Sequence, residues 1–185
     1  FSKKIIKRNT SYIKDDIYLT GNIADASVGL YILKKNINLK KIFKNYFIDK
    51  YFKPDLPYGF HRELFKFASS SMDVSDGLLV DLKKLINNKN KGFIINLEYL
   101  PKSFYFNELV KGKKISIYNH LFQGDDYQIL FTSNKRNRKS IKKYAKKWNQ
   151  KITKIGSVIK GNQNYLKNNN KLNKISDYQG YIHNF

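Results

Sequence analysis

Residues 71–86 read SMDVSDGLLVDLKKLI, and this stretch decides the fold class. Residues 71–74 have the composition of a short strand, and the Ser-Asp-Gly triplet at 75–77 is typical of a turn. The large apolar residues that follow recur at positions 78, 82, 85 and 86, which is the stripe of an amphipathic helix. The stretch therefore predicts a strand, a tight turn and a helix that buries one face.

The rest of the chain mixes strands and helices without strict alternation. The patterns predict strands at 17–20, 93–97, 127–131 and 152–159, and a short strand around Ile5-Ile6 within residues 1–8. They predict helices at 25–33, 42–51, 61–70 and 135–148, and a hairpin or loose loop at 161–174. This order favours the α+β class, with a mixed β-sheet layered with helices.

The composition is that of a domain with an ordinary core, because 41% of the 185 residues are hydrophobic. No run approaches the roughly 18 apolar residues of a membrane helix, and no secretory signal precedes residue 20. The chain has no Cys, which excludes disulfides, thiolate metal sites and Cys nucleophiles. We therefore expect a cytoplasmic protein that has no membrane partner.

The formal net charge of +22 raises the question of a nucleic-acid partner. However, 32 of the 36 basic residues are Lys and only 4 are Arg, the side chain that reads phosphates and bases with two donors. Asn and Ile occur 21 times each, as in proteins from genomes rich in A and T. Residues 135–148 combine basic residues with helical apolar spacing. We interpret them as the solvated face of a surface helix, with a nucleic-acid surface as the alternative, and expect no nucleic-acid partner.

Two carboxylates stand at the predicted turn after residue 74. Asp73 and Asp76 flank a strand-to-helix turn, where both can reach one pocket. Mg²⁺ takes carboxylate oxygens together with substrate phosphate oxygens. Ser75 adds a hydroxyl, Gly77 permits close backbone approach, and free N–H groups at a helix start suit phosphate. The alternative is that Ser75 or Asp76 is only the helix N-cap and the other carboxylate is solvated.

A second acidic pair precedes the strand predicted at 127–131. Asp125 and Asp126 could hold a metal or accept hydrogen bonds from an amine-bearing substrate, or could simply form the turn into that strand. In the tail at 180–185, Tyr181 could stack on a flat heterocycle or belong to a core or interface. Arg8 could contact phosphate or lie on the surface. The three His residues show no ligand spacing, so we expect no transition-metal site.

Taken in order, these motifs resemble the C-terminal part of the thiamine-monophosphate kinase family, which belongs to the aminoimidazole-ribonucleotide-synthetase-like ATP-binding superfamily. Residues 68–82, ASSSMDVSDGLLVDL, look like the family's A-S-S-x-x-D-x-S-D-G-L-x-x-D-L. Residues 124–132, GDDYQILFT, look like G-E-D-Y-E-L-x-F-T, and residues 20–30, TGNIADASVGL, look like T-G-x-L-G-D-S-A-x-G-L. The end, GYIHNF at 180–185, is similar to a closing G-aromatic-x-H-F.

The resemblance implies the reaction ATP + thiamine monophosphate → ADP + thiamine diphosphate, with Mg²⁺. It implies these roles: Asp73 and Asp76 as metal ligands, Arg8 and Ser75 as ATP contacts, Asp125 as a contact to the thiamine phosphate, and Tyr181 packed on its aromatic part. The chain departs from the family's patterns in several places: Asp125 and Gln128 replace Glu, Ala24 replaces Gly, and Asn184 is an additional residue in the closing motif.

The resemblance also implies a domain organisation. Residues 1–16 correspond to the end of an N-terminal ATP-binding domain, and residues 17–185 to the C-terminal α+β domain. The family's dimer forms mainly through the N-terminal domain, so a homodimer is expected for the longer protein. We expect the 185 residues alone not to catalyse the reaction. A non-catalytic nucleotide- or thiamine-phosphate-binding domain is the alternative, and a basic nucleic-acid binder a more distant one.

Overall fold

The computed structural model describes residues 5–35, 37–86 and 90–175. The strands are β1 (Asp16–Thr20), β2 (Ala68–Asp73), β3 (Lys91–Asn96), β4 (Ile129–Ser133), β5 (Ile152–Lys160), β6 (Tyr165–Asn168) and β7 (Lys171–Lys174). The α-helices are α1 (Asp25–Lys35), α2 (Lys41–Phe52), α3 (Leu78–Ile86), α4 (Phe104–Lys111), α5 (Ile117–His120) and α6 (Arg138–Lys147). The 3₁₀ turns are η1 (Phe60–Lys66), η2 (Leu97–Tyr99) and η3 (Lys135–Asn137).

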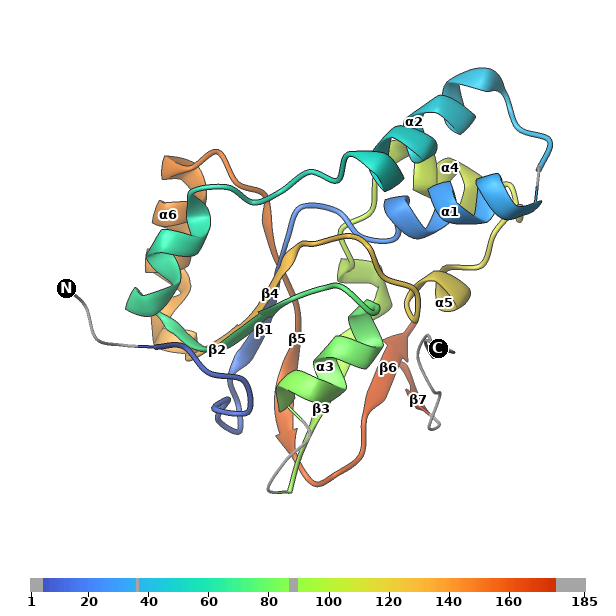
Figure 1. The fold of residues 1–185 in the computed structure, drawn as a ribbon. Helices are drawn as coiled ribbons and strands as arrows, with labels where there is room; N and C mark the ends of the chain where they lie inside the picture. The colour runs from blue at the N-terminus through green and yellow to red at the C-terminus, as the bar shows by residue number, and fades with distance from the viewer. Residues whose placement is uncertain (1–4, 36, 87–89, 176–185) are drawn as a thin grey trace, which may run out of the picture.

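The strands form one mixed sheet in the order β2-β4-β1-β5-β3-β6-β7 (Figure 1). The pair β3–β6 is parallel and the other neighbouring pairs are antiparallel. The α+β class with a mixed sheet is therefore confirmed. Since β1 lies inside the sheet, all five of its residues are buried.

Helices and turns cover both faces of the sheet. On one face, α3 packs its predicted stripe of Leu78, Leu82, Leu85 and Ile86 against a core that includes Ile17 and Leu19 of β1. The other face carries Tyr18 and a cluster contributed by η1, β4 and α6. Successive residues of β1 thus serve opposite cores, as the period of two of a strand requires.

A third hydrophobic cluster lies at one end of the sheet, where α1, α2 and α4 lie together (Figure 1). Val28 and Ile32 of α1, Phe47 of α2 and Phe106 of α4 are its most buried members. This small helical layer fixes the position of α1, which begins five residues after the end of β1.

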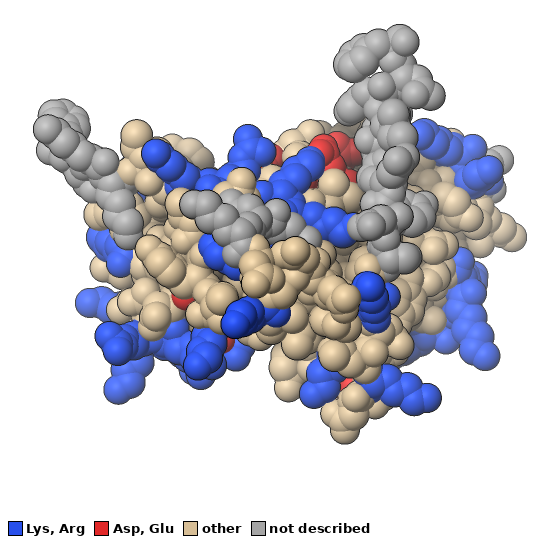
Figure 2. Space-filling view, turned by 90° about the horizontal axis from the view of Figure 1, so that it is seen from below, with Lys and Arg blue, Asp and Glu red and all other residues tan. Residues whose placement is uncertain are grey.

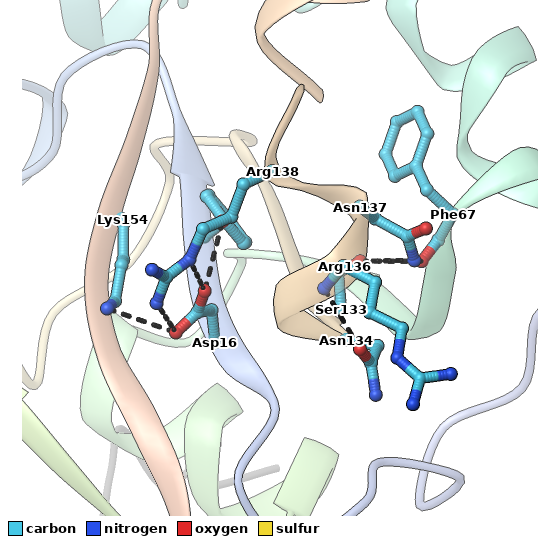
Figure 3. Close-up of polar contacts among 9 residues, drawn as sticks. Asp16, Phe67, Ser133, Asn134, Arg136, Asn137, Arg138 and Lys154 are labelled. Atoms are coloured by element: carbon cyan, nitrogen blue, oxygen red, sulfur yellow. Dashed lines mark hydrogen bonds and ion pairs between the residues drawn. The ribbon is translucent and has the colours of Figure 1, made fainter. Parts of the chain in front are cut away.

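A buried carboxylate fixes α6 to the middle of the sheet (Figure 3). Asp16 at the start of β1 accepts hydrogen bonds from Nε of Arg138 at 2.6 Å and from Nη2 at 3.0 Å, and pairs with Lys154 of β5 at 3.0 Å. Burial by itself would raise the pKa of Asp16, but these two cations outweigh it and hold the pKa below its ordinary value. The carboxylate therefore stays ionised inside the fold.

Most predicted elements are confirmed, with shifts of a few residues at their ends. Residues 161–174, left open between hairpin and loop, form the β6–β7 hairpin. Asn169 and Asn170 turn it with φ of 44° and 65°, the left-handed pair that a tight hairpin needs. The basic segment forms η3 and α6, in which Ile141 is buried and the lysines are exposed. Lysine and arginine side chains are spread over the face seen in Figure 2 rather than gathered over one element.

Two of the sequence predictions are wrong. Residues 61–70 are not one helix, because η1 ends at Lys66 and β2 begins at Ala68. Pairing with β4 overrides the local helical pattern there, and the buried hydroxyls of Ser70 and Thr132 lie 2.9 Å apart. Residues 5–8 form no strand, and Ile5 is 79% exposed. The strand predicted at 127–131 is confirmed as β4 but begins two residues later, because the chain is still turning at Tyr127 with φ of 49°.

Among the described residues, none of the helices has the length and apolar character needed to span a bilayer.

Candidate functional site

The two acidic motifs lie side by side. The segment after β2 runs along the segment before β4, so that the N–H of Val74 donates to the carbonyl of Gln128 at 2.9 Å and Tyr127 returns a bond to Val74 at 2.9 Å. The N–H of Asp125 then donates to the carbonyl of Ser75 at 3.0 Å. The β2–β4 pairing thus continues into the loops, and residues about fifty positions apart form one surface.

Glycine allows this close approach of the two loops. A Cβ on Gly124 would lie 1.7 Å from the carbonyl oxygen of Ser75, far inside van der Waals contact. Gly77 has φ of +126°, a conformation that other residues rarely adopt, and a Cβ there would meet the backbone of Phe122 at 2.6 Å. Each loop therefore carries one glycine where its partner's backbone presses against it.

Asp81, which the motif analysis did not single out, organises the turn before α3. Its Oδ2 accepts hydrogen bonds from the N–H groups of Ser75 at 2.9 Å, Asp76 at 2.9 Å and Gly77 at 3.2 Å, and its side chain is fully buried. The N–H groups of residues 75–77 are therefore occupied by Asp81 and are not free for phosphate in this structure. These three residues precede α3, so the alternative that Ser75 or Asp76 caps the helix stays a prediction. An Asp four positions after Gly77 was the signal that could have revealed this role of Asp81.

The two residues of the second acidic pair, Asp125 and Asp126, lie in different environments. Asp126 is buried and its Oδ2 accepts a hydrogen bond from the N–H of Ala24 at 2.8 Å. Burial raises the pKa of Asp126 to about 8, and the nearby Asp25 adds to this. Asp125 is half-buried and lines a pocket to which Asp126 does not contribute. Asp125 therefore lies where a ligand in this pocket would meet it, and its role as a contact residue stays a prediction.

Asp126 and Gln128 also form hydrogen bonds with the third motif, residues 20–30. The side-chain oxygen of Gln128 accepts from the hydroxyl of Thr20 at 2.8 Å, and a Cβ on Gly21 would overlap that amide. Ala24, with φ of 72°, donates to Asp126 from a left-handed turn that leads into α1. The three motifs quoted from the sequence therefore converge in space.

A pocket of about 260 Å³ lies where the three motifs meet. One side of it is formed by Ser75, Asp76, Gly124 and Asp125, and the other by α1, including Tyr31 and Lys34. Three of the predicted site residues, Ser75, Asp76 and Asp125, are therefore brought together. Carboxylates, a hydroxyl, a lysine and an aromatic ring in one pocket suit a small ligand that carries both charge and a ring.

Asp73 lies next to this group rather than inside the pocket. It is exposed at the end of β2, and its negative charge, with that of Asp125, raises the pKa of the Tyr127 phenol. The effect of Asp125 is the largest, and the Tyr127 hydroxyl lies 3.4 Å from its Oδ1. Asp73 and Asp125 therefore lie around the same phenol, which sequence analysis did not identify as part of the site.

Asp76 forms an ion pair with Lys84 of α3, and Lys84 also lies 3.2 Å from Asp81. Within residues 5–35, 37–86 and 90–175, no group of three or more His, Asp or Glu side chains is placed to hold a metal ion. A cation at this place would therefore need ligand atoms besides the two predicted carboxylates.

The structure does not bring Arg8 to the pocket. Arg8 is exposed in a turn anchored by Thr10, whose hydroxyl donates to the carbonyl of Ser69 at 2.6 Å. Ser69 is near the start of β2, so four residues of strand, on the order of 13 Å, separate this anchor from Asp73. Tyr181 lies outside the described residues.

No family model matches the chain. It is similar to a curated thiamine-monophosphate kinase of Buchnera aphidicola subsp. Acyrthosiphon pisum, at 32% identity over 177 residues, which cover 95% of this chain and 54% of that protein. The thiamine-monophosphate kinase of Nitrosopumilus maritimus is 32% identical over 188 residues, 98% of this chain and 57% of that protein. The chain thus spans about half the length of the curated relatives it matches.

Solved structures match the fold. The structure of AaThiL complexed with AMPPCP and TMP superposes with a TM-score of 0.79 at 24% identity, covering 98% of this chain and 55% of that one. The hydrogenase maturation protein HypE of Escherichia coli gives a TM-score of 0.74 at 10% identity, covering 95% of this chain and 53% of that one. The aminoimidazole-ribonucleotide-synthetase-like fold expected from the sequence is therefore confirmed.

Proposed function

The chain is related in sequence and fold to thiamine-monophosphate kinases over about half of their length, and from this premise we propose that it is part of an enzyme that transfers the γ-phosphoryl group of ATP to thiamine monophosphate. The observation that carries the proposal is the convergence of the three motifs on one pocket that holds Ser75, Asp76 and Asp125. A related kinase has been solved with both an ATP analogue and TMP, which supports the same two substrates here.

The chemistry asks for positioning and charge neutralisation. In the reaction a phosphate oxygen of thiamine monophosphate attacks the γ-phosphorus, the bond to the bridging oxygen of ADP breaks, and ADP leaves as an anion. Phosphoryl transfer of this kind needs little covalent participation by the protein. We propose that Ser75 and Arg8 contact ATP, and that Asp125 and Tyr181 contact thiamine monophosphate.

Asp73 and Asp76 fit the requirements of Mg²⁺, which commonly takes one or two protein carboxylates together with substrate phosphates and water. Two carboxylates match that donor set, and we propose that these residues hold the ion. No cluster of three or more His, Asp or Glu side chains placed to hold a metal ion is found in the part of the chain that the structure describes. When bound, Mg²⁺ neutralises charge on the phosphates. Because Asp76 pairs with Lys84, binding there requires the lysine to release it.

The homodimer and the cytoplasmic location remain predictions of the same proposal. Sedimentation of the protein in full and fractionation of the cells that make it would check them.

The proposal is tested with the protein in its full form, by following thiamine diphosphate formation from thiamine monophosphate, ATP and MgCl₂. Asp73→Asn is expected to lower kcat by orders of magnitude, because it removes a charged metal ligand. The matched control is Asp49→Asn, which changes an exposed aspartate on α2 and is expected to leave the rate unchanged. Absence of thiamine diphosphate from the unaltered protein, or equal rates for both variants, would contradict the proposal.

A further inference from the structure

The wall of the pocket formed by α1 has no role in the function proposed above. Tyr31 and Lys34 line it from α1, one helical turn apart, together with Leu30. The facing loops contribute the carboxylates of Asp76 and Asp125. The pocket is therefore polarised, with an aromatic ring and a cation on one wall and negative charge on the other.

Tyr31 is held in place from its buried side. Its ring meets the ring of His120 edge to face, with 6.0 Å between centroids. His120 is itself fixed, because its Nδ1 lies 2.9 Å from the hydroxyl of the buried Ser27 and its ring meets Phe106 at 6.0 Å. Burial lowers the pKa of His120 to about 4, so the imidazole behind Tyr31 is neutral at physiological pH. The ring that packs behind Tyr31 is therefore uncharged.

Thiamine monophosphate has a charge pattern that complements this pocket. Its thiazolium ring is a flat aromatic cation, and its phosphate is an anion at the other end of a short chain. An aromatic face and a carboxylate both attract such a cation, and a lysine attracts the phosphate. A nucleotide has no permanently cationic ring, so it gains less from Tyr31 and Asp125 together.

We propose, on the basis of the function proposed above, that α1 forms the acceptor side of the pocket, where Tyr31 packs on the thiazolium ring and Lys34 binds the phosphate of thiamine monophosphate. Lys34 then selects the phosphorylated vitamin over free thiamine, while Tyr31 contributes equally to both. Leu30 adds apolar contact beside the ring.

The test for Lys34 measures, in the full protein, KM for thiamine monophosphate, KM for ATP, and the inhibition constant of free thiamine. Lys34→Gln is expected to raise KM for thiamine monophosphate about tenfold, as loss of a charged hydrogen bond implies, and to leave the other two constants within about twofold. Lys35→Gln removes the same charge from the next residue of α1, which is exposed and outside the pocket lining, and is expected to change nothing.

The test for Tyr31 uses two variants. Tyr31→Leu removes the aromatic face and is expected to weaken both thiamine monophosphate and free thiamine about fivefold, whereas Tyr31→Phe keeps both within about twofold. Leu33→Ala, at an exposed position of the same helix, is the control. Thermal unfolding of each variant shows that the fold is kept.

The outcomes separate the two proposals. If the unaltered protein forms no thiamine diphosphate, the proposed function fails and this inference fails with it. If the unaltered protein is active but Lys34→Gln behaves like Lys35→Gln, or raises KM for ATP instead, only the assignment of α1 is overturned. Equal effects of Tyr31→Leu and Tyr31→Phe would overturn the role of the ring.

Discussion

Replacing Asp81 by Asn tests how the turn before α3 is built. The carboxylate is buried and one of its oxygens accepts three backbone hydrogen bonds, from residues 75, 76 and 77. The amide side chain has nearly the same shape but no charge. Asp81→Asn therefore changes the strength of these bonds with little change in packing.

The magnitude follows from the number of bonds. A neutral hydrogen bond contributes about 0.5–1.5 kcal/mol and a charge-assisted one about twice as much, so weakening three charge-assisted bonds to neutral ones costs about 1.5–4.5 kcal/mol. For a chain of this length each kcal/mol shifts the melting temperature by about 2–4 °C, which predicts a decrease of about 3–18 °C. Because the same turn carries Ser75 and Asp76, binding of the ATP analogue AMPPCP with Mg²⁺ is expected to weaken as well.

Urea unfolding at pH 7 measures the loss directly, and Asp76→Asn is the matched control. Both aspartates pair with Lys84, so both variants remove an ion pair with the same lysine. Asp76 is partly exposed and accepts none of the three backbone bonds, so its replacement is expected to cost no more than about 1 kcal/mol. Equal destabilisation by the two variants would show that Asp81 does not hold the turn, and the reasoning would be refuted.

Three further outcomes can be measured by the same unfolding assays. Gly124→Ala is expected to lower the free energy of unfolding by at least about 1–3 kcal/mol, because the added Cβ would overlap the carbonyl of Ser75. Gly112→Ala, where the nearest atom to the added Cβ lies at 3.3 Å, should be nearly neutral. Equal losses of stability would contradict the close approach of the two loops. Because the pKa of Asp126 is raised, the folded state keeps the proton of this carboxyl to a higher pH than the unfolded state does. The free energy of unfolding should therefore fall by on the order of a few kcal/mol as pH rises from about 4 to 8, and Asp126→Asn should flatten this slope. An unchanged slope would assign the pH dependence to other groups. The lowered pKa of Asp16 has the opposite effect on stability, because the ionised carboxylate stabilises the folded state. Asp16→Asn should therefore destabilise the fold by about 1–3 kcal/mol at pH 7, and the difference from the unaltered chain should shrink as pH falls below about 3.8. A pH-independent difference would count against the ion pairs.

Local spacing determined much of the fold in advance. The stripe on α3, the turn at 75–77 and the buried strand predicted at 17–20 depend on neighbours a few residues apart, and the structure confirms them. The helix predicted at 61–70 is wrong because it was based on the local pattern alone. Pairing of Ser70 and Ser71 with β4 stabilises the extended conformation more than the local pattern stabilises a helix. Local preference is weak enough for a sheet partner to override it.

The sequence motifs predicted candidate residues for the site but did not predict how these residues are arranged in space. Asp125 and Asp126 are adjacent in sequence, yet one lines the pocket and the other is buried against Ala24, about a hundred positions away. Asp81, Tyr31 and Lys34 gain their places only through the packing of α3 and α1 against the loops. The sequence by itself determined which chemical groups the chain carries and the local turns that hold them. The tertiary structure decided which of those groups share one pocket, because sheet pairing and helix packing join segments whose separation along the chain leaves no local pattern.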